Sequence, residues 1–272
     1  YYQIIVNEQG SLDIYDKLAD YHYQNQAVLV ENGDDGDSFN YSPPRQDLEI
    51  FSTNSKFDYR IDGSSLYQKI TINYELIIPA NLQERAKQQT SIKLPVILEV
   101  VLRKGSKVID LNVHVDNHGL SHRLCILFDS ALTTRFNYAD QQFGLIKRPN
   151  SYDKEMKLYL EGLSNQEKIE KPKELVNWAN DQSTWQEPPI SIEPTQSYVA
   201  LTDESRGIAV IPQGVREYEV IGEQGNQIRL TLFRTYGFMG KENLVYRPGR
   251  ASGERIIATP AAQLLKEMDF KL

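Results

Sequence analysis

Cysteine is scarce in this chain of 272 residues, its 30 Lys and Arg are outnumbered by 37 Asp and Glu, and long apolar runs are absent. The single cysteine, Cys125, has no partner for an internal disulfide, so the fold needs no oxidising compartment. The net charge of -7 argues against nucleic acid or an anionic membrane as a partner, because both attract clustered Lys and Arg. No apolar run approaches the roughly 20 residues that span a bilayer. We therefore expect a cytoplasmic protein that binds neither nucleic acid nor membranes.

The two ends of the sequence have no terminal signals. The chain opens with "YYQIIVN", inside an alternating apolar pattern, without an initiator Met or a signal peptide, and it closes with "KEMDFKL". We interpret residues 1–272 as one β-sandwich region excised from a longer polypeptide.

Alternation of apolar and polar residues dominates the chain and predicts strands. Residues 3–7 and 12–16 flank a hairpin-like turn at Gly10, residues 65–79 form a long strand, and residues 93–117 form two strands joined at a Lys-Gly-Ser turn. Further strands are predicted at "HRLCILF", "QFGLIK", "YVALTD", "GIAVIP", "REYEVI" and "QIRLTLFRTY". About a dozen strands with a turn every eight to twelve residues are typical of a large all-β antiparallel sandwich.

Helical signals are few and short. Residues 164–181 are highly charged and are interrupted by Pro172, which favours a surface insertion with a short helix. Residues 259–268 begin with Thr and Pro, so they form either a helix or a connecting loop.

Three of the four histidines lie in the segment "HVDNHGLSH", at positions 114, 118 and 122. On a helix this spacing would align them on one face that could hold zinc. Residues 109–116 alternate with period two, however, so His114 lies on a strand, and Asn117-His118-Gly119 reads as a turn. A hairpin could still bring His114 near His122. We favour a structural role for these histidines and expect no metal site in this chain.

Residues 31–45 contain three aspartates around Gly36, followed by aromatic residues and two prolines. The spacing does not match the calcium loop of an EF-hand. One interpretation is an acidic loop closed by its prolines. The other is a loop that presents Asp37, Phe39 and Tyr41 to a polyhydroxylated ligand, because carboxylates accept hydrogen bonds from sugar hydroxyls and aromatic rings cover the C–H faces of a pyranose.

The segment 212–221 contains two acids, Glu217 and Glu219, shortly after a glycine turn. Two neighbouring acids suggest acid/base or nucleophilic chemistry. They lie about 7 Å apart on one face of a predicted strand, which is equally typical of a solvated pair. Contact of Arg216, Glu217 and Tyr218 with a substrate is a further alternative.

Several segments together resemble one family. "GDDGDSFNYSPP" resembles a loop of the bacterial α-mannosidases of glycoside hydrolase family 38, which include the mannosylglycerate hydrolases. The segment "KGSKVIDLNVHVDNHGLSHRLCILFDS" resembles a strand pair of that family. Four more segments follow in the family's order: "QFGLIKRP", "VALTDESRGIAVIPQGVREYEV", "LTLFRTYGFMG" and "RPGRASGERIIATPAAQ". The resemblance covers residues 25 to 265.

The resemblance implies a division of labour within a longer enzyme. Family members begin with an α/β catalytic domain and a helical bundle, and they end with a β portion of the galactose-mutarotase-like supersandwich type. This chain resembles the β portion, so its expected partners are the catalytic domain of the same polypeptide and a mannoside substrate. The family's zinc or other divalent cation and its nucleophilic aspartate belong to the earlier part. The implied mechanism is retaining, with two carboxyl groups roughly 5 Å apart.

The resemblance also implies roles for two segments. The Gly36–Phe39 loop would hold an aromatic residue beside the sugar, although Phe39 lacks the hydroxyl of the tyrosine that is common there. The turn from Gly214 to Glu219 would approach the same pocket, with Arg216 able to meet an anionic group. His122 and Arg123 would be structural.

Two other functions stay open from the sequence. One is a free-standing carbohydrate-binding or structural sandwich. The other is a mutarotase-like epimerase, in which His114 or His122 would act with Glu217 as acid and base. A homo-oligomer is compatible with each of the three.

Overall fold

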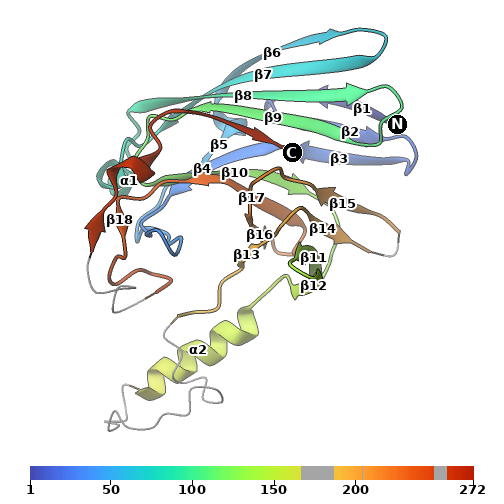
Figure 1. Ribbon diagram of the computed structural model, residues 1–272. Helices are drawn as coiled ribbons and strands as arrows, with labels where there is room; N and C mark the ends of the chain where they lie inside the picture. Colours follow the sequence, from blue (N-terminus) through green and yellow to red (C-terminus); the bar gives the residue numbers. More distant parts are fainter. Residues whose placement is uncertain (167–186, 204, 248–255) are drawn as a thin grey trace.

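Two large antiparallel sheets packed face to face form the body of the protein (Figure 1). The computed structural model describes residues 1–166, 187–203, 205–247 and 256–272. The five-stranded sheet has the order β20-β9-β8-β7-β6, and the six-stranded sheet has the order β13-β16-β17-β10-β4-β5. The first sheet consists of β6 (Lys56–Gly63), β7 (Tyr67–Ile78), β8 (Ile92–Arg103), β9 (Ile109–Asp116) and β20 (Glu267–Lys271). The second consists of β4 (Val28–Gly33), β5 (Ile50–Phe51), β10 (His122–Asp129), β13 (Ile192–Pro194), β16 (Glu217–Ile221) and β17 (Gln227–Arg234).

The core lies between these sheets because alternate residues of each strand point inward. Along β7, for example, Ile70, Ile72, Tyr74, Leu76 and Ile78 are buried, as the period-two pattern predicts. The inner face of β10 contributes Leu124 and Ile126 to the same core. Cys125 points to the opposite face and is a buried free thiol.

Three smaller sheets flank this sandwich. The N-terminal sheet consists of β1 (Tyr2–Val6), β2 (Leu12–Asp16) and β3 (Tyr21–Gln26), and its first hairpin turns at Gly10 as predicted. A four-stranded sheet consists of β11 (Phe136–Gln141), β12 (Gly144–Pro149), β14 (Val199–Thr202) and β15 (Gly207–Val210). A two-stranded sheet consists of β18 (Phe238–Met239) and β19 (Ile257–Ala258).

Helices are few and short. Among the described residues they are α1 (Leu82–Ala86), α2 (Asp153–Gln166) and the 3-10 turns Ser52–Asn54 and Pro260–Gln263. The α2 helix extends away from the sheets (Figure 1). It was not predicted, and the helix expected at 164–181 falls mostly outside the described residues. In the described part of the chain, no helix is long and apolar enough to cross a membrane.

The architecture confirms the predicted all-β antiparallel sandwich with few short helices. The segment 259–268 is mainly a connection, since one 3-10 turn leads directly into β20. The hairpin that could have brought His114 near His122 is not formed, because β9 pairs with β8 and β20 while β10 pairs with β4 and β17 in the other sheet.

Candidate functional site

The two segments singled out from the sequence emerge at the same end of the six-stranded sheet. Gly33 at the end of β4 pairs with His122 at the start of β10, and Arg123 pairs with Arg234 at the end of β17. The first residue of β16, Glu217, pairs with β17 close to that end. The loop after β4 and the turn before β16 are therefore separated by two intervening strands, a spacing of about 14 Å.

The acidic loop after β4 is held by basic residues from more than 190 positions downstream. Its three ion pairs are Asp34–Arg234, Asp35–Lys241 and Asp37–Arg247. Arg234 donates from Nε to Asp34 Oδ2 at 2.7 Å and from Nη2 to Oδ1 at 3.3 Å, a two-pronged contact. Burial raises the pKa of Asp34, and Arg234 offsets this only in part.

Asp37, one of the six candidate residues, is buried within this loop. Burial works to raise its pKa, but the guanidinium of Arg247 and the backbone N–H groups of Lys241, Phe39 and Asn40 hold the pKa below its usual value. The N–H of Lys241 donates to Asp37 Oδ2 at 2.7 Å. Because both carboxylate oxygens already accept these bonds, Asp37 fixes the loop rather than facing solvent. The interpretation of an acidic loop with a structural role fits this residue.

The two aromatic candidates of the loop lie in different environments. The Phe39 side chain is 58% exposed at the tip. Tyr41 is buried, with its hydroxyl accepting a hydrogen bond from Asn32 Nδ2 at 2.9 Å and its ring 3.8 Å from the guanidinium carbon of Arg123. Of the pair, only Phe39 can meet a ligand without a rearrangement of the loop.

A cluster of charged side chains covers the outer face of the sheet next to Tyr41. Arg123 donates to Glu219 Oε1 at 2.9 Å and to Asn32 Oδ1 at 3.0 Å. Arg229 donates to the same Asn32 oxygen at 2.9 Å and lies 3.6 Å from Glu219. The side chains of this cluster are all buried. Their mutual ion pairs and hydrogen bonds offset the cost of burying the charges. Glu219 is therefore an ion-pair partner, and the pair Glu217–Glu219 is not a solvated one.

Sequence reasoning missed this cluster, since "RLTLFRTY" reads as a strand with a wet edge. Arg229 and Arg234 both form ion pairs with carboxylates and are largely shielded from solvent. One signal could have revealed it: Glu219 on β16 and Arg229 on β17 are directly paired across the sheet, so their opposite charges lie side by side on the same face.

In the second candidate segment, residues 216–218, the three side chains differ in exposure and in their hydrogen bonds. Arg216 is exposed and has no ion pair within the described residues. Glu217 is half-buried, and its Oε1 atom has no hydrogen-bond partner there; the same holds for Nη1 of Arg123. Tyr218 is buried, donating to Asn137 Oδ1 at 2.6 Å and accepting from Arg148 at 2.9 Å. Arg216 is thus the exposed member of this segment, and Glu217 is only partly accessible.

The three histidines of "HVDNHGLSH" do not converge. His114 bonds Asp269 and His118 bonds Asp116, each at 3.0 Å near the surface. His122 is fully buried between Glu31, 3.1 Å from Nδ1, and Asn117, 2.8 Å from Nε2. Across the described ranges, no group of three or more His, Cys, Asp or Glu side chains could hold a metal ion.

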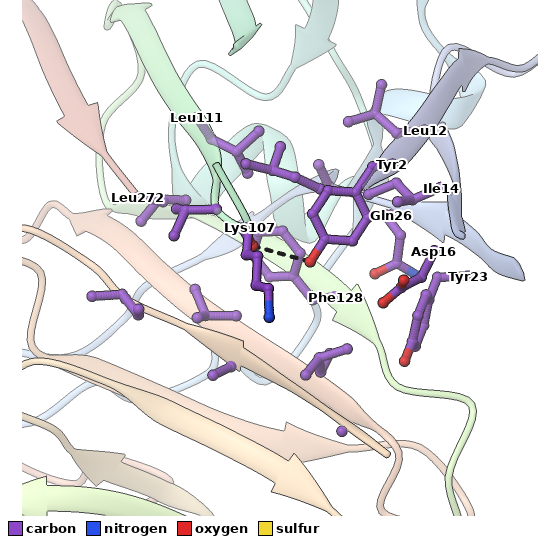
Figure 2. A pocket seen from close by; sticks show the side chains of 18 residues that line it. Tyr2, Leu12, Ile14, Asp16, Tyr23, Gln26, Lys107, Leu111, Phe128 and Leu272 are labelled. Carbon is purple, nitrogen blue, oxygen red and sulfur yellow. Dashed lines mark hydrogen bonds between the residues drawn. The ribbon is translucent and has the colours of Figure 1, made fainter. Parts of the chain in front are cut away.

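An apolar cavity of about 340 Å³ lies elsewhere, between the N-terminal sheet, the β8–β9 turn and β15 (Figure 2). Figure 2 shows Tyr2 Oη, which donates to the carbonyl oxygen of Lys107 at 3.0 Å, beside the cavity. Its charged lining residues are Asp16 and Lys107, and none of the six candidate residues lines it. The cavity therefore contains neither the histidine nor the glutamate that the epimerase alternative needs.

Most of the chain matches a known protein family. The family model "Glycosyl hydrolases family 38 C-terminal domain" matches residues 1–238. A protein of Halalkalibacterium halodurans named "Putative mannosylglycerate hydrolase" is 24% identical over 265 residues, which cover 90% of this chain and 26% of that protein.

Two solved structures share the fold. The crystal structure of an alpha-mannosidase from Enterococcus faecalis V583 matches all of this chain and 28% of its own, with a TM-score of 0.76 and 22% identity. A protein in the glycosyl hydrolase family 38 from Enterococcus faecalis matches with the same coverage, a TM-score of 0.74 and 20% identity. The chain thus spans about a quarter of the length of these relatives. From its match to the family model over most of its length, this chain belongs to the C-terminal domain of glycosyl hydrolases family 38.

Proposed function

We propose that this chain is the β-sandwich part of a retaining α-mannosidase and that it completes the sugar pocket of a catalytic domain in the same polypeptide. The observation that carries the proposal is the shared sheet end at which the Phe39 loop and the Arg216 turn emerge. Ligand sites are formed where side chains of several segments converge, and these two segments offer exposed groups at one end.

The exposed groups suit a carbohydrate. The ring of Phe39 can cover the apolar C–H face of a pyranose, and the guanidinium of Arg216 can donate to a hydroxyl or a carboxylate. A mannoside with an anionic aglycone, such as mannosylglycerate, would engage both. Asp37 and Tyr41 contribute indirectly, since their hydrogen bonds hold the loop that carries Phe39.

The metal belongs, in this proposal, to the catalytic domain. The described residues of this chain offer no set of ligands that fits zinc, because His114, His118 and His122 each pair separately with a carboxylate. A divalent cation bound to the sugar hydroxyls would stabilise the charge that develops in the transition state. Both catalytic carboxyl groups would likewise come from outside this chain.

The alternatives have less support. An epimerase with His122 as acid or base is disfavoured because that ring is fully buried and bonded on both nitrogens. A free-standing carbohydrate-binding sandwich would use the same exposed groups and differs by lacking hydrolysis.

The test is hydrolysis of an aryl α-mannoside by this chain and by the complete polypeptide. We expect only the complete polypeptide to be active. Within it, Phe39→Ala should lower kcat/KM roughly fivefold, in line with the loss of about 1 kcal/mol of aromatic contact. Phe143→Ala is the matched control, because Phe143 is an exposed aromatic residue in the β11–β12 turn.

Arg216→Ala should raise KM for an anionic mannoside more than for a neutral one. Equal activity of the short chain alone, or equal effects of Phe39→Ala and Phe143→Ala, would contradict the proposal.

A further inference from the structure

Strand β6 forms an open edge of the five-stranded sheet. It runs over Lys56–Gly63, pairs with β7 on one side, and has no strand partner on the other side within the described residues. Figure 1 shows it at the outer margin of the sandwich. Eight residues of unpaired edge are a template for another strand, so proteins normally protect such an edge or use it.

The backbone groups that face outward belong to the odd-numbered residues. The N–H of Ser64 donates to the carbonyl oxygen of Tyr67 at 2.8 Å, so position 64 is hydrogen-bonded across the hairpin. Hydrogen-bonded positions alternate along an antiparallel pair, and the even residues of β6 therefore bond to β7. The N–H and C=O groups of residues 57, 59 and 61 point away from β7.

The side chains of β6 follow a pattern with two-fold symmetry. The even positions alternate in charge and are Lys56, Asp58, Arg60 and Asp62. The odd positions are apolar and are Phe57, Tyr59 and Ile61. Tyr59 is 48% exposed and Ile61 is 62% exposed, although both lie on the face that is buried further along the sheet.

This pattern fits an antiparallel pair made of β6 and the β6 strand of a second copy, if the two-fold axis that relates the two strands passes through Tyr59. Lys56 then lies opposite Asp62 of the second copy, and Asp58 lies opposite Arg60. Phe57 lies opposite Ile61, and the two Tyr59 rings meet. The outward-facing backbone groups of residues 57, 59 and 61 pair with one another, which gives six hydrogen bonds.

The two neighbouring symmetric registers are excluded by charge. An axis through Asp58 would place Asp58 opposite itself and Lys56 opposite Arg60. An axis through Arg60 would place Arg60 opposite itself and Asp58 opposite Asp62. Like charges directly opposite each other are destabilising, so of these three registers the one centred on Tyr59 is favoured.

We propose that this edge binds a second copy of the chain, with the two β6 strands joined antiparallel about Tyr59 into one continuous ten-stranded sheet. The present contacts of the charged residues allow this. Asp58 accepts a hydrogen bond from Asn73, and Arg60 lies 3.3 Å from Asp62, all at exposed positions. Exposed ion pairs are worth little individually and exchange partners readily.

Charge reversal in the complete polypeptide tests the proposal, with the oligomeric state measured by sedimentation velocity. The wild type should be a dimer. Asp58→Arg and Arg60→Glu should each weaken the dimer roughly tenfold or more, because symmetry makes every reversal act twice. The double variant D58R/R60E should restore the wild-type affinity. Asp110→Lys on β9, an exposed reversal away from the edge, should have no effect.

Cysteine variants test the register. Tyr59→Cys would place two thiols opposite each other at a Cα separation of about 5.5 Å, which a disulfide can bridge. Arg60→Cys would face Asp58 of the second copy, so mild oxidation should link Tyr59→Cys only. The native Cys125 is buried and does not compete.

A monomeric wild type, a dimer indifferent to both charge reversals, or linkage through Arg60→Cys in place of Tyr59→Cys would overturn the proposal.

Discussion

At the scale of single residues, the Glu31 carboxylate is a fully buried charge that links three elements. It is buried between the two sheets, forms an ion pair with Arg85, and lies 3.1 Å from Nδ1 of His122. Arg85 lies on the five-residue helix α1 and is itself buried. One carboxylate therefore connects α1, β4 and β10.

Replacing this carboxylate should be costly. Glu31→Ala leaves the buried Arg85 without its main counter-charge, and we expect the free energy of unfolding to fall by about 3–5 kcal/mol. Urea denaturation followed by circular dichroism measures the change. Glu75→Ala removes an exposed pair with Lys93 and should cost less than about 1 kcal/mol. Similar losses in both variants would show that the buried pair is not special.

A second residue predicts how stability depends on pH. Asp140 on β11 accepts hydrogen bonds from the N–H groups of Ser197 at 2.7 Å and of Gln196 and Tyr198 at 3.1 Å each. Desolvation works to raise the pKa of Asp140, but the hydroxyl and N–H of Ser197 hold the pKa well below its usual value. A carboxyl group whose pKa is lower in the folded state stabilises the fold above its unfolded pKa of about 3.9.

That stabilisation is lost as the pH falls through and below this value. Asp140→Asn should therefore lose less stability than the wild type between about pH 5 and pH 2. Urea denaturation at a series of pH values gives the comparison. Glu267→Gln, at an exposed carboxylate on β20, serves as the control and should keep the wild-type slope. An unchanged slope for Asp140→Asn would contradict the assignment.

At the scale of elements, the loop after β4 depends on Gly36. A Cβ atom at this position would lie 2.1 Å from the carbonyl oxygen of Asn40 and 2.8 Å from the N atom of Ser42. Gly36→Ala must therefore open the loop, and we expect a loss of about 1–3 kcal/mol in unfolding free energy. Thermal or urea denaturation measures this loss.

The same substitution should raise KM for α-mannosides in the complete polypeptide, because it moves Phe39. Gly144→Ala is the control, since no atom lies within 4 Å of the Cβ that it would add. If Gly36→Ala changed stability without changing KM, the loop would be structural only.

The elements also show what the sequence could predict. Strands such as β7 and β9 were predictable, because one side of each faces the core and period two follows directly. The α2 helix was missed, although Ser151 Oγ accepts from the N–H of Asp153 at its start. Its composition is mostly polar and charged, so the sequence lacks a clear stripe of apolar residues at helical spacing.

At the scale of the whole molecule, pairing between distant segments was beyond local sequence reasoning. β10 joins β4 to β17, and the loop aspartates bind arginines and a lysine far downstream. Local pattern does not specify which strands meet, because that choice depends on the global packing of the core. The sequence therefore selected the six candidate residues by the chemistry of their side chains. It could not show that Asp37, Tyr41 and Tyr218 are buried, because their burial depends on the packing of distant segments.

The position of β20 has a consequence for how the protein is made. This strand closes the five-stranded sheet by pairing with β9, so that Asp269 meets His114, 155 positions earlier in the chain. A ribosome releases β9 long before β20, and the edge of β9 stays uncovered during that interval. Nascent chains stalled between these strands should therefore be the species that chaperones hold and that aggregate when chaperones are scarce.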